Sequence, residues 1–291
     1  DDTVVANMQY LLKVVDIANE FVTGVATNYS AGEYATQDAA DTVVVRQAFD
    51  TLLKEVVVID HEYPFELSLT ATGTFSFTMS AMGEFFVDWG DGNLQTITKN
   101  DTANTTYSHS YSGGSSYKFR LGGVATDYND DASTATISFA NNAAITSIAG
   151  NLSMVFPTLD SGENPRFYNT FAGLSGVSGA LPANLFIDLT GNPVPNMFRG
   201  TFSGTDFRGA IPEKIFGTLT GAPAEGMFYE TFRGLAQLTN AIPATLFSGI
   251  TGAPATDMFR GTFYGCMKLR GNVPSGLFAG IGGAPAPGMF S

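Results

Sequence analysis

Few side chains in this 291-residue sequence could carry catalysis. The chain has two histidines, His61 and His109, and a single cysteine, Cys266. One cysteine forms neither an intrachain disulfide nor a multi-cysteine zinc site, and two histidines leave little for acid–base chemistry. His61-Glu62 is followed by Tyr-Pro-Phe and so does not continue as His-Glu-x-x-His. We therefore predict no catalytic residue, no cofactor and no enzymatic activity; a secreted enzyme with a concealed site is the weakest alternative.

Carboxylates offer the other possible chemistry, because Ca²⁺ binds clustered oxygen ligands. The weak calcium candidates are Asp88, Asp91, Asp127, Asp130 and Asp131. Their spacing fits no EF-hand loop, and a tight turn followed by a solvated loop explains them equally simply. We favour the turn and the loop, and predict no metal.

Charge is scarce and uneven along the chain. Lys and Arg number 14 against 27 Asp and Glu, so the net charge is −13. Residues 1–62 carry −8, residues 63–165 carry −7 and residues 166–291 carry +2. The acidic balance argues against nucleic acid, and no apolar run is long enough to span a bilayer. The three charge regions suggest three structural regions.

Residues 1–62 have the pattern of two amphipathic helices. Val4, Met8, Leu11 and Val15 recur at three- and four-residue steps. We expect a helical hairpin packed on the next domain, or alternatively an assembly element through which the chain forms a homo-oligomer. The chain opens with acids rather than with a secretory leader, so we expect a leader to have been removed.

Residues 63–150 have the alternation of β-strands. Apolar residues alternate with polar ones along 65–69 and again along 75–79, and an apolar strand ends in Asp88-Trp-Gly-Asp-Gly92. Alternating strands around Tyr107–Tyr111 and Tyr117–Leu121 follow, with a Gly-Gly turn between them.

These motifs resemble the polycystic-kidney-disease (PKD) type β-sandwich, a relative of the immunoglobulin sandwich. The resemblance rests on the Trp-Gly-Asp-Gly turn, on Tyr-Ser-His-Ser-Tyr at 107–111 and on Tyr-Lys-Phe at 117–119. It implies a non-catalytic extracellular spacer or binding module, in which His109 is a packed strand residue.

Residues 151–291 contain an internal repeat, the strongest signal in the sequence. Met-Phe recurs at 197, 227, 258 and 289, with a degenerate copy at Arg166-Phe167, and the steps between the phenylalanines are 31, 30, 31 and 31 residues. Thr-Phe follows three residues after each complete Phe except the last. Pro and Gly recur at the same period. The 30-residue step arises because Phe202 and Pro212 are 10 residues apart, where the other units have 11.

Each unit has the pattern of two short helices and one extended piece. Met227, Phe228, Thr231 and Phe232 fall on one helical face, and a following Gly would end the helix. One unit cannot bury its own phenylalanines, so we expect about four units, the last incomplete, to stack into ladders of Phe and Met. Cys266 is expected to be a buried, inert thiol.

The segments ending at Pro182, Pro212, Pro243 and Pro274 resemble leucine-rich repeats, and Met-Phe-x-x-Thr-Phe-x-Gly resembles the BspA-like subclass of bacterial surface proteins. That family also places a PKD-like domain upstream. The resemblance implies adhesion to a protein or glycan, on another cell or in the same assembly, rather than catalysis. The departure is that the full Leu-x-x-Leu-x-Leu strand pattern is missing.

Variable polar positions of the repeat are the candidate binding surface. Arg199, Tyr229 and Arg260 each follow Met-Phe directly, and Arg208 and Arg270 occupy a second row. Aligned Arg and Tyr suit the binding of proteins or acidic glycans; the alternative is an ordinary solvated face.

We therefore predict a multidomain α+β fold. It comprises a helical hairpin (1–62), an immunoglobulin/PKD-like β-sandwich (63–150) and a leucine-rich-like α/β solenoid (151–291). The predicted function is adhesion by an extracellular or cell-surface protein. The alternative is a structural subunit of an extracellular filament, pilus-like appendage or phage fibre. The sequence stops inside a repeat without a polar cap, so we expect either further chain or a covering partner there.

Overall fold

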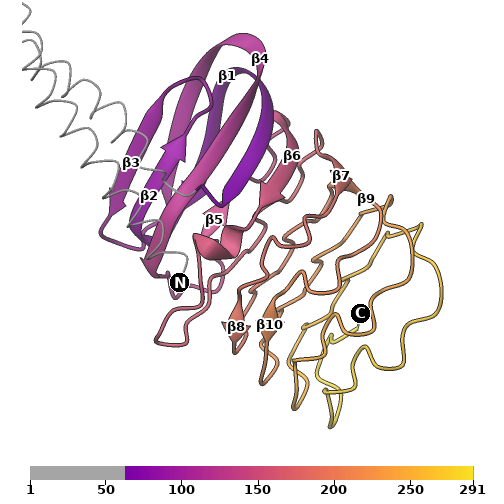
Figure 1. Ribbon diagram of the computed structural model, residues 1–291. Coiled ribbons are helices and arrows are strands. Elements are labelled where there is room, and N and C mark those ends of the chain that lie inside the picture. Colours follow the sequence, from indigo (N-terminus) through magenta and orange to yellow (C-terminus); the bar gives the residue numbers. More distant parts are fainter. Residues whose placement is uncertain (1–62, 291) are drawn as a thin grey trace, which may run out of the picture. The chain divides into compact units, whose positions relative to one another are not determined.

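The computed structural model describes residues 63–290, which lie in one compact unit of β-structure (Figure 1). The predicted helical hairpin, its suggested role in oligomerisation and His61 lie outside the described residues. The strands are β1 Phe65–Met79, β2 Met82–Asp88, β3 Leu94–Lys99, β4 Thr105–Asp127, β5 Ile137–Ser138, β6 Ile145–Gly150, β7 Ser178–Ala180, β8 Thr190–Gly191, β9 Asp206–Arg208 and β10 Thr218–Leu219, and a 3-10 turn, η1, spans Leu152–Met154.

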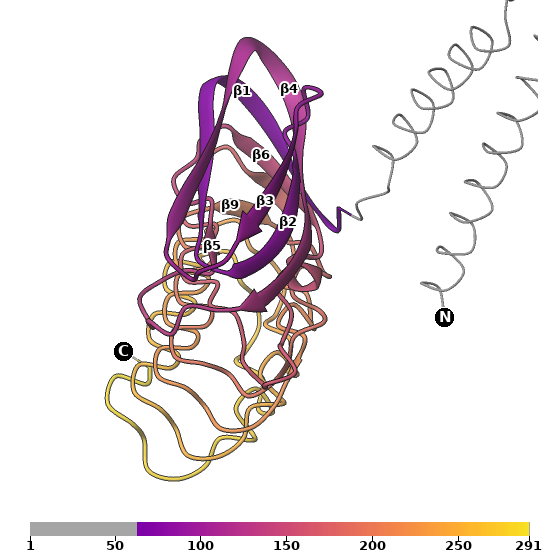
Figure 2. The same ribbon diagram turned by 90° about the vertical axis from the view of Figure 1, so that its left-hand side faces the viewer.

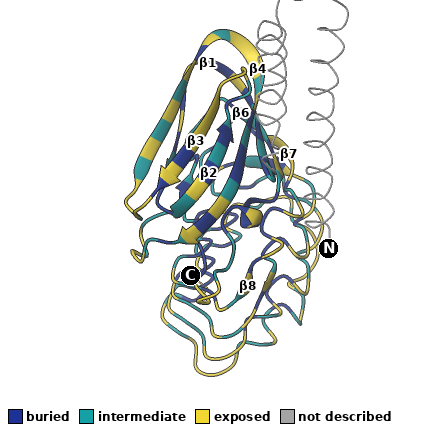
Figure 3. Ribbon diagram, turned by 60° about the vertical axis from the view of Figure 1, so that its left-hand side comes forward, coloured by how far each residue is buried: buried dark blue, intermediate teal, exposed yellow. Residues whose placement is uncertain are grey.

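Six strands form one antiparallel sheet in the order β3-β2-β4-β1-β5, with β6 paired to the other end of the same edge of β1. The long strands β1 and β4 pair from Phe65 opposite Leu121 to Met79 opposite Thr105. Alternate residues of β1 are buried, as the banding in Figure 3 shows, because successive side chains of a strand point to opposite faces.

The predicted two-sheet sandwich is therefore wrong, and so is the predicted turn at Gly113-Gly114. Both glycines lie inside β4, and the two alternating runs of β1 are one strand rather than two. The register shifts between Ala71 and Gly73, where β4 supplies extra residues. A bulge of this kind bends a long ribbon without ending it, and Gly at a bulge has the same sequence signature as Gly in a turn.

Residues after η1 form a stack of coils joined by short parallel pairings rather than an α/β solenoid. β7 pairs with β9 and β8 with β10, and single bridges such as Gly221–Ile250 continue the pairing from coil to coil. Figure 2 shows these coils nested below the sheet. Within the described residues η1 is the only helical element, so the predicted α+β class is corrected to a mostly β fold.

Hydrogen bonding explains why the Met-Phe segments are not helices. The amides of Phe198 and Gly200 donate to the carbonyls of Met227 and Tyr229 in the next coil, each at 2.8 Å, whereas the amide of Thr201 donates to Phe198 at 3.2 Å. Half of the amides in the segment thus donate to carbonyls of the next coil. In an α-helix, each amide would donate to the carbonyl four residues earlier in the same helix.

Left-handed residues at every fourth position give these segments their helix-like spacing. Asn196, Gly200 and Gly204 have φ values of 57°, 61° and 71°. An α-helix does not tolerate such residues in its interior. A turn repeated every four residues returns side chains to one side, and this period is close to the 3.6 residues of a helix.

Two columns of phenylalanine rings run through the stack and confirm the predicted ladders. Phe167, Phe198, Phe228, Phe259 and Phe290 follow one another with ring centroids 5.7–5.9 Å apart. The second column comprises Phe139, Phe171, Phe202, Phe232 and Phe263, spaced by 5.6–6.0 Å.

The second column joins the sheet to the repeats. Phe139 follows β5 in the chain and stacks on Phe171 at 5.9 Å, and Phe65 of β1 lies 6.1 Å from the same ring. The buried residues accordingly form one cluster from the sheet to the last coil. No helix in the described part of the chain is long and apolar enough to cross a bilayer.

Candidate functional site

Stacking of the coils brings the residues that follow Met-Phe into one row. The carbonyls of Arg199, Tyr229 and Arg260 accept the amides of Asn169, Gly200 and Glu230 from the preceding coils, each at 2.8 Å. Because every coil repeats this bond, equivalent side chains emerge one above another.

The side chains of this row interleave as cations and aromatic rings. The guanidinium carbon of Arg199 lies 4.1 Å from the ring centroid of Tyr229 and 5.8 Å from that of Tyr168, and Arg260 lies 5.5 Å from Tyr229. A guanidinium within about 6 Å of a tyrosine face is attracted by the ring quadrupole. We call Tyr168, Arg199, Tyr229 and Arg260 the Tyr/Arg row.

Tyr168 was missed at the level of sequence because it follows the degenerate Arg166-Phe167 copy. The sequence does indicate Tyr168, because it directly follows Phe167 just as the other members of the row directly follow their phenylalanines. A neighbouring pair was also missed: Arg233 lies 5.6 Å from the ring of Tyr264. These cations are held by aromatic stacking as well as by charge.

Carboxylates lie beside Arg260 of the row and beside the neighbouring Arg233 but leave both cations exposed. Arg260 and Asp257 approach to 3.5 Å, as do Arg233 and Glu230, and the arginine side chains remain 48% and 49% exposed. Exposed pairs of this kind contribute about 0–1 kcal/mol. Both guanidinium groups can therefore take an additional anionic partner.

Arg208 and Arg270 lie on a different part of the coil. Arg208 belongs to β9 and forms an ion pair with Asp206 at 2.7 Å. Arg270 occupies the equivalent segment two coils later, where its amide donates to the carbonyl of Asn240 at 2.8 Å. Both side chains are exposed, but they belong to a second row, as the sequence indicates, and not to the Tyr/Arg row.

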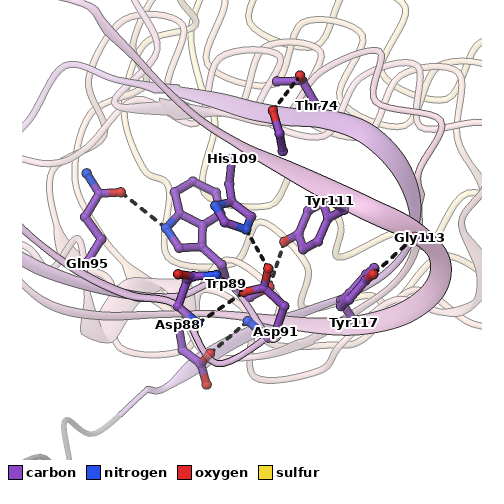
Figure 4. A network of polar contacts seen from close by, with 12 residues as sticks. Thr74, Asp88, Trp89, Asp91, Gln95, His109, Tyr111, Gly113 and Tyr117 are labelled. Carbon is purple, nitrogen blue, oxygen red and sulfur yellow. Dashed lines mark hydrogen bonds and ion pairs between the residues drawn. The ribbon is translucent and has the colours of Figure 1, made fainter.

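The Trp-Gly-Asp-Gly turn between β2 and β3 is held against β4 by the contacts in Figure 4. His109 Nε2 lies 2.7 Å from a carboxylate oxygen of Asp91, and the His109 ring stacks on Trp89 at 5.1 Å. Tyr111 donates its hydroxyl to the carbonyl of Trp89 at 2.6 Å. The Asp91 carboxylate also accepts from the amide of Asn93. Each of these groups already has a structural partner.

The surroundings of Asp91 favour its charged form. Burial raises the pKa of this carboxyl, but hydrogen bonds from His109 and Asn93 outweigh burial, so its pKa lies below the ordinary value. Asp88 accepts from the amide of Gly90 at 2.8 Å and from Arg120 at 3.1 Å. Both aspartates therefore serve the turn.

The remaining calcium candidates are not gathered around a common point. Asp127 accepts from the amide of Tyr128, and Asp131 caps the turn of Ser133 at 2.9 Å. Backbone and hydroxyl hydrogen bonds from this turn lower the pKa of Asp131. Across residues 63–290 no group of three His, Cys, Asp or Glu side chains is placed to hold a metal ion. Asp130 belongs to the same acidic loop.

Cys266 is a partly buried free thiol. Its sulfur donates to the carbonyl of Phe232 at 3.0 Å, and burial raises its pKa to about 11. The group is thus held as the protonated thiol at neutral pH, a form that reacts slowly.

Comparisons with family models, with curated proteins and with solved structures find no match to this chain.

Proposed function

We propose that the coil stack is a non-enzymatic binding platform that holds an acidic protein or glycan against the Tyr/Arg row. The observation that carries the proposal is the alternation of guanidinium and phenol groups along four successive coils. Arg and Tyr are enriched among residues that dominate binding energy, because each combines a large apolar surface with hydrogen-bond donors.

Local charge supports an acidic partner. Residues 166–291 carry +2, whereas the rest of the chain carries −15. The acidic remainder would repel an acidic partner from other faces, which favours approach to the coils. An adhesive role outside the cell rests on the resemblance of the motifs to surface proteins.

The test measures binding of the full chain to immobilised heparin, hyaluronan and poly-aspartate. Arg199→Ala with Arg260→Ala should weaken binding to the preferred polymer by about ten-fold. Arg208→Ala with Arg270→Ala removes the same charge from the second row and is the matched control. An equal loss of binding in both double variants would show that only net charge matters and would contradict the assignment to the Tyr/Arg row. If the unaltered chain binds none of the three polymers, the proposal of an acidic partner is refuted.

A further inference from the structure

Two arginines of the Tyr/Arg row contact the side chain that lies three residues earlier in the same coil. Arg260 approaches the carboxylate of Asp257 to 3.5 Å. Arg199 donates to the amide oxygen of Asn196 at the same distance of 3.5 Å. Asn196 and Asp257 also share a left-handed backbone, with φ values of 57° and 54°. The two coils therefore repeat one geometry, but the partner of the arginine is a carboxylate in one coil and a neutral amide in the other.

The charge of Arg199 has no carboxylate in contact with it. Within the described part of the chain, no Asp or Glu lies at ion-pair distance from its guanidinium, whereas Arg260 has Asp257. An anion that approaches Arg260 is repelled by this carboxylate as well as attracted by the cation. Arg199 is also half-buried, and salt screens a half-buried charge less than an exposed one. An incoming anion is therefore held better at Arg199 than at Arg260.

Two tyrosines hold Arg199 without using its hydrogen-bond donors. Its guanidinium carbon lies 4.1 Å from the ring centroid of Tyr229 and 5.8 Å from that of Tyr168. Stacking uses the face of a guanidinium, so the N–H groups in its plane remain available to a carboxylate. Neither phenol hydroxyl is hydrogen-bonded to another residue within the range 63–290. The site thus offers one planar cation flanked by two free hydroxyl groups.

The charge of the neighbouring sheet limits which anions can use this site. Residues 63–165 carry −7, whereas residues 166–291 carry +2. A polymer with a charge on every unit brings many negative groups near the acidic part of the molecule and is repelled. An isolated carboxylate interacts mainly with charges within the Debye length of about 8 Å, so Arg199 attracts it locally. The combination favours a ligand whose anionic groups are far apart.

We infer that the Tyr/Arg row binds a sparsely charged acidic glycan, in which uncharged sugars separate the carboxylates, and that Arg199 holds one carboxylate of this glycan. A carboxylate accepts two parallel hydrogen bonds from a planar guanidinium. The hydroxyls of Tyr168 and Tyr229 pair with the hydroxyls of the adjoining uncharged sugars. This inference rests on the proposed function and narrows its partner to one class of polymer.

A comparison of three short polymers of equal length tests the class of ligand. The full chain is titrated by NMR with octasaccharides of hyaluronan, in which every second sugar carries a carboxylate, and of densely sulfated heparin, and with octa-aspartate. We expect a dissociation constant on the order of 1 mM for hyaluronan and binding about five-fold weaker for the other two. Heparin or octa-aspartate that binds as tightly as hyaluronan would overturn this inference and leave the proposed acidic partner intact. Binding of none of them would overturn both.

Single variants test the assignment to Arg199. Arg199→Gln should weaken the binding of the hyaluronan octasaccharide by about five-fold. Arg260→Gln removes the same charge from the same row, beside Asp257, and should weaken binding by no more than about two-fold. Equal losses in the two variants, or unchanged binding in Arg199→Gln, would overturn the assignment.

Exchanging the neighbouring amide and carboxylate tests the reason for the difference. Asn196→Asp gives Arg199 the partner that Arg260 has and should weaken binding about as much as Arg199→Gln. Asp257→Asn makes the reverse change and should not weaken binding. The Asn196 amide also donates to the carbonyl of Ala132 at 3.0 Å, so the melting temperature of Asn196→Asp is measured as a check of its folding. Unchanged binding in a folded Asn196→Asp variant, or weaker binding in Asp257→Asn, would contradict the inference.

Discussion

Thr231 shows how single side chains join neighbouring coils. Its hydroxyl donates to the carbonyl of Phe198 at 2.8 Å, and Thr201 and Thr262 make the same bond to Phe167 and Phe228. These threonines are buried. The recurring Thr of the Thr-Phe motif is therefore a hydrogen-bond donor to the preceding coil and not part of a helical face.

Replacing this donor should destabilise the stack. Thr231→Val keeps the shape but removes the hydroxyl, so the free energy of unfolding should fall by about 1 kcal/mol. Thr231→Ser retains the hydroxyl donor, so its free energy of unfolding should fall by less. Thr220→Val, at an exposed position, should leave the free energy of unfolding nearly unchanged. Urea unfolding followed by circular dichroism measures all three. A loss in Thr231→Ser as large as in Thr231→Val would indicate that packing, not the hydrogen bond, is responsible.

Asp91 should contribute to the acid sensitivity of the sheet. Its pKa is lowered in the folded chain, so its contribution to stability is present above the ordinary value of about 3.9 and is lost as pH falls through the folded pKa. Urea unfolding followed by Trp89 fluorescence should show stability falling from about pH 4 towards pH 2. Asp91→Asn should make this decline shallower.

Asp160→Asn, at an exposed carboxylate in the loop before the repeats, is the control for that experiment. It should leave the decline unchanged. An identical decline in Asp91→Asn and in the unaltered chain would show that the contact between Asp91 and His109 does not stabilise the turn.

At the scale of the coil, large and small residues alternate along one column of left-handed positions. Asn169, Gly200, Glu230 and Gly261 occupy the same place in successive coils, with φ values between 50° and 61°. The side chain of Asn169 lies over Gly200, where a Cβ would meet its oxygen at 2.0 Å. Side chains at all four positions would collide, so the alternation follows from the close spacing of the coils.

This geometry predicts a large difference between two glycine substitutions. Gly200→Ala combines a left-handed backbone with a collision and should cost about 2–4 kcal/mol. Gly209→Ala has a φ of 83° but nothing within 4 Å of the new Cβ, so it should cost only the backbone strain of about 1–2 kcal/mol. Thermal unfolding measures both. Equal losses of stability in the two variants would show that the Asn169 side chain moves away from the new Cβ at no cost.

At the scale of the molecule, the sheet and the coils share one core. Phe171 lies at the junction, because its ring contacts Phe65 and Phe139 on one side and Phe202 on the other. Each unit of a stack is stabilised by its interfaces with the neighbouring units. The sheet should consequently depend on the first coil.

Phe171→Ala tests this dependence. It should destabilise the protein by about 3–5 kcal/mol and shift both the fluorescence transition of Trp89, the only tryptophan, and the circular dichroism transition of the whole unit. Phe259→Ala, deeper in the stack and away from the sheet, should shift the fluorescence transition less. A Trp89 transition that is unchanged in Phe171→Ala would contradict a shared core.

Several features of the candidate site could be predicted from the sequence. The places of Arg199, Tyr229 and Arg260 followed from the period alone, because equivalent residues of a stacked repeat must lie in line. The contact of Arg199 with Tyr168 could not be predicted, since it depends on how closely neighbouring coils approach. The prediction of a sandwich was wrong because glycine is typical both of a β-bulge and of a turn between two strands.

The repeat, its period and the burial of its phenylalanines follow from the sequence alone, because a unit of about 31 residues cannot cover these rings alone. That the described units contain no helices became clear only in three dimensions. The choice depends on where each amide finds its acceptor, and for half of the amides in the Met-Phe segments that acceptor is a carbonyl of the next coil. Four-residue spacing is compatible with either arrangement, so the long-range hydrogen bonds settle the outcome.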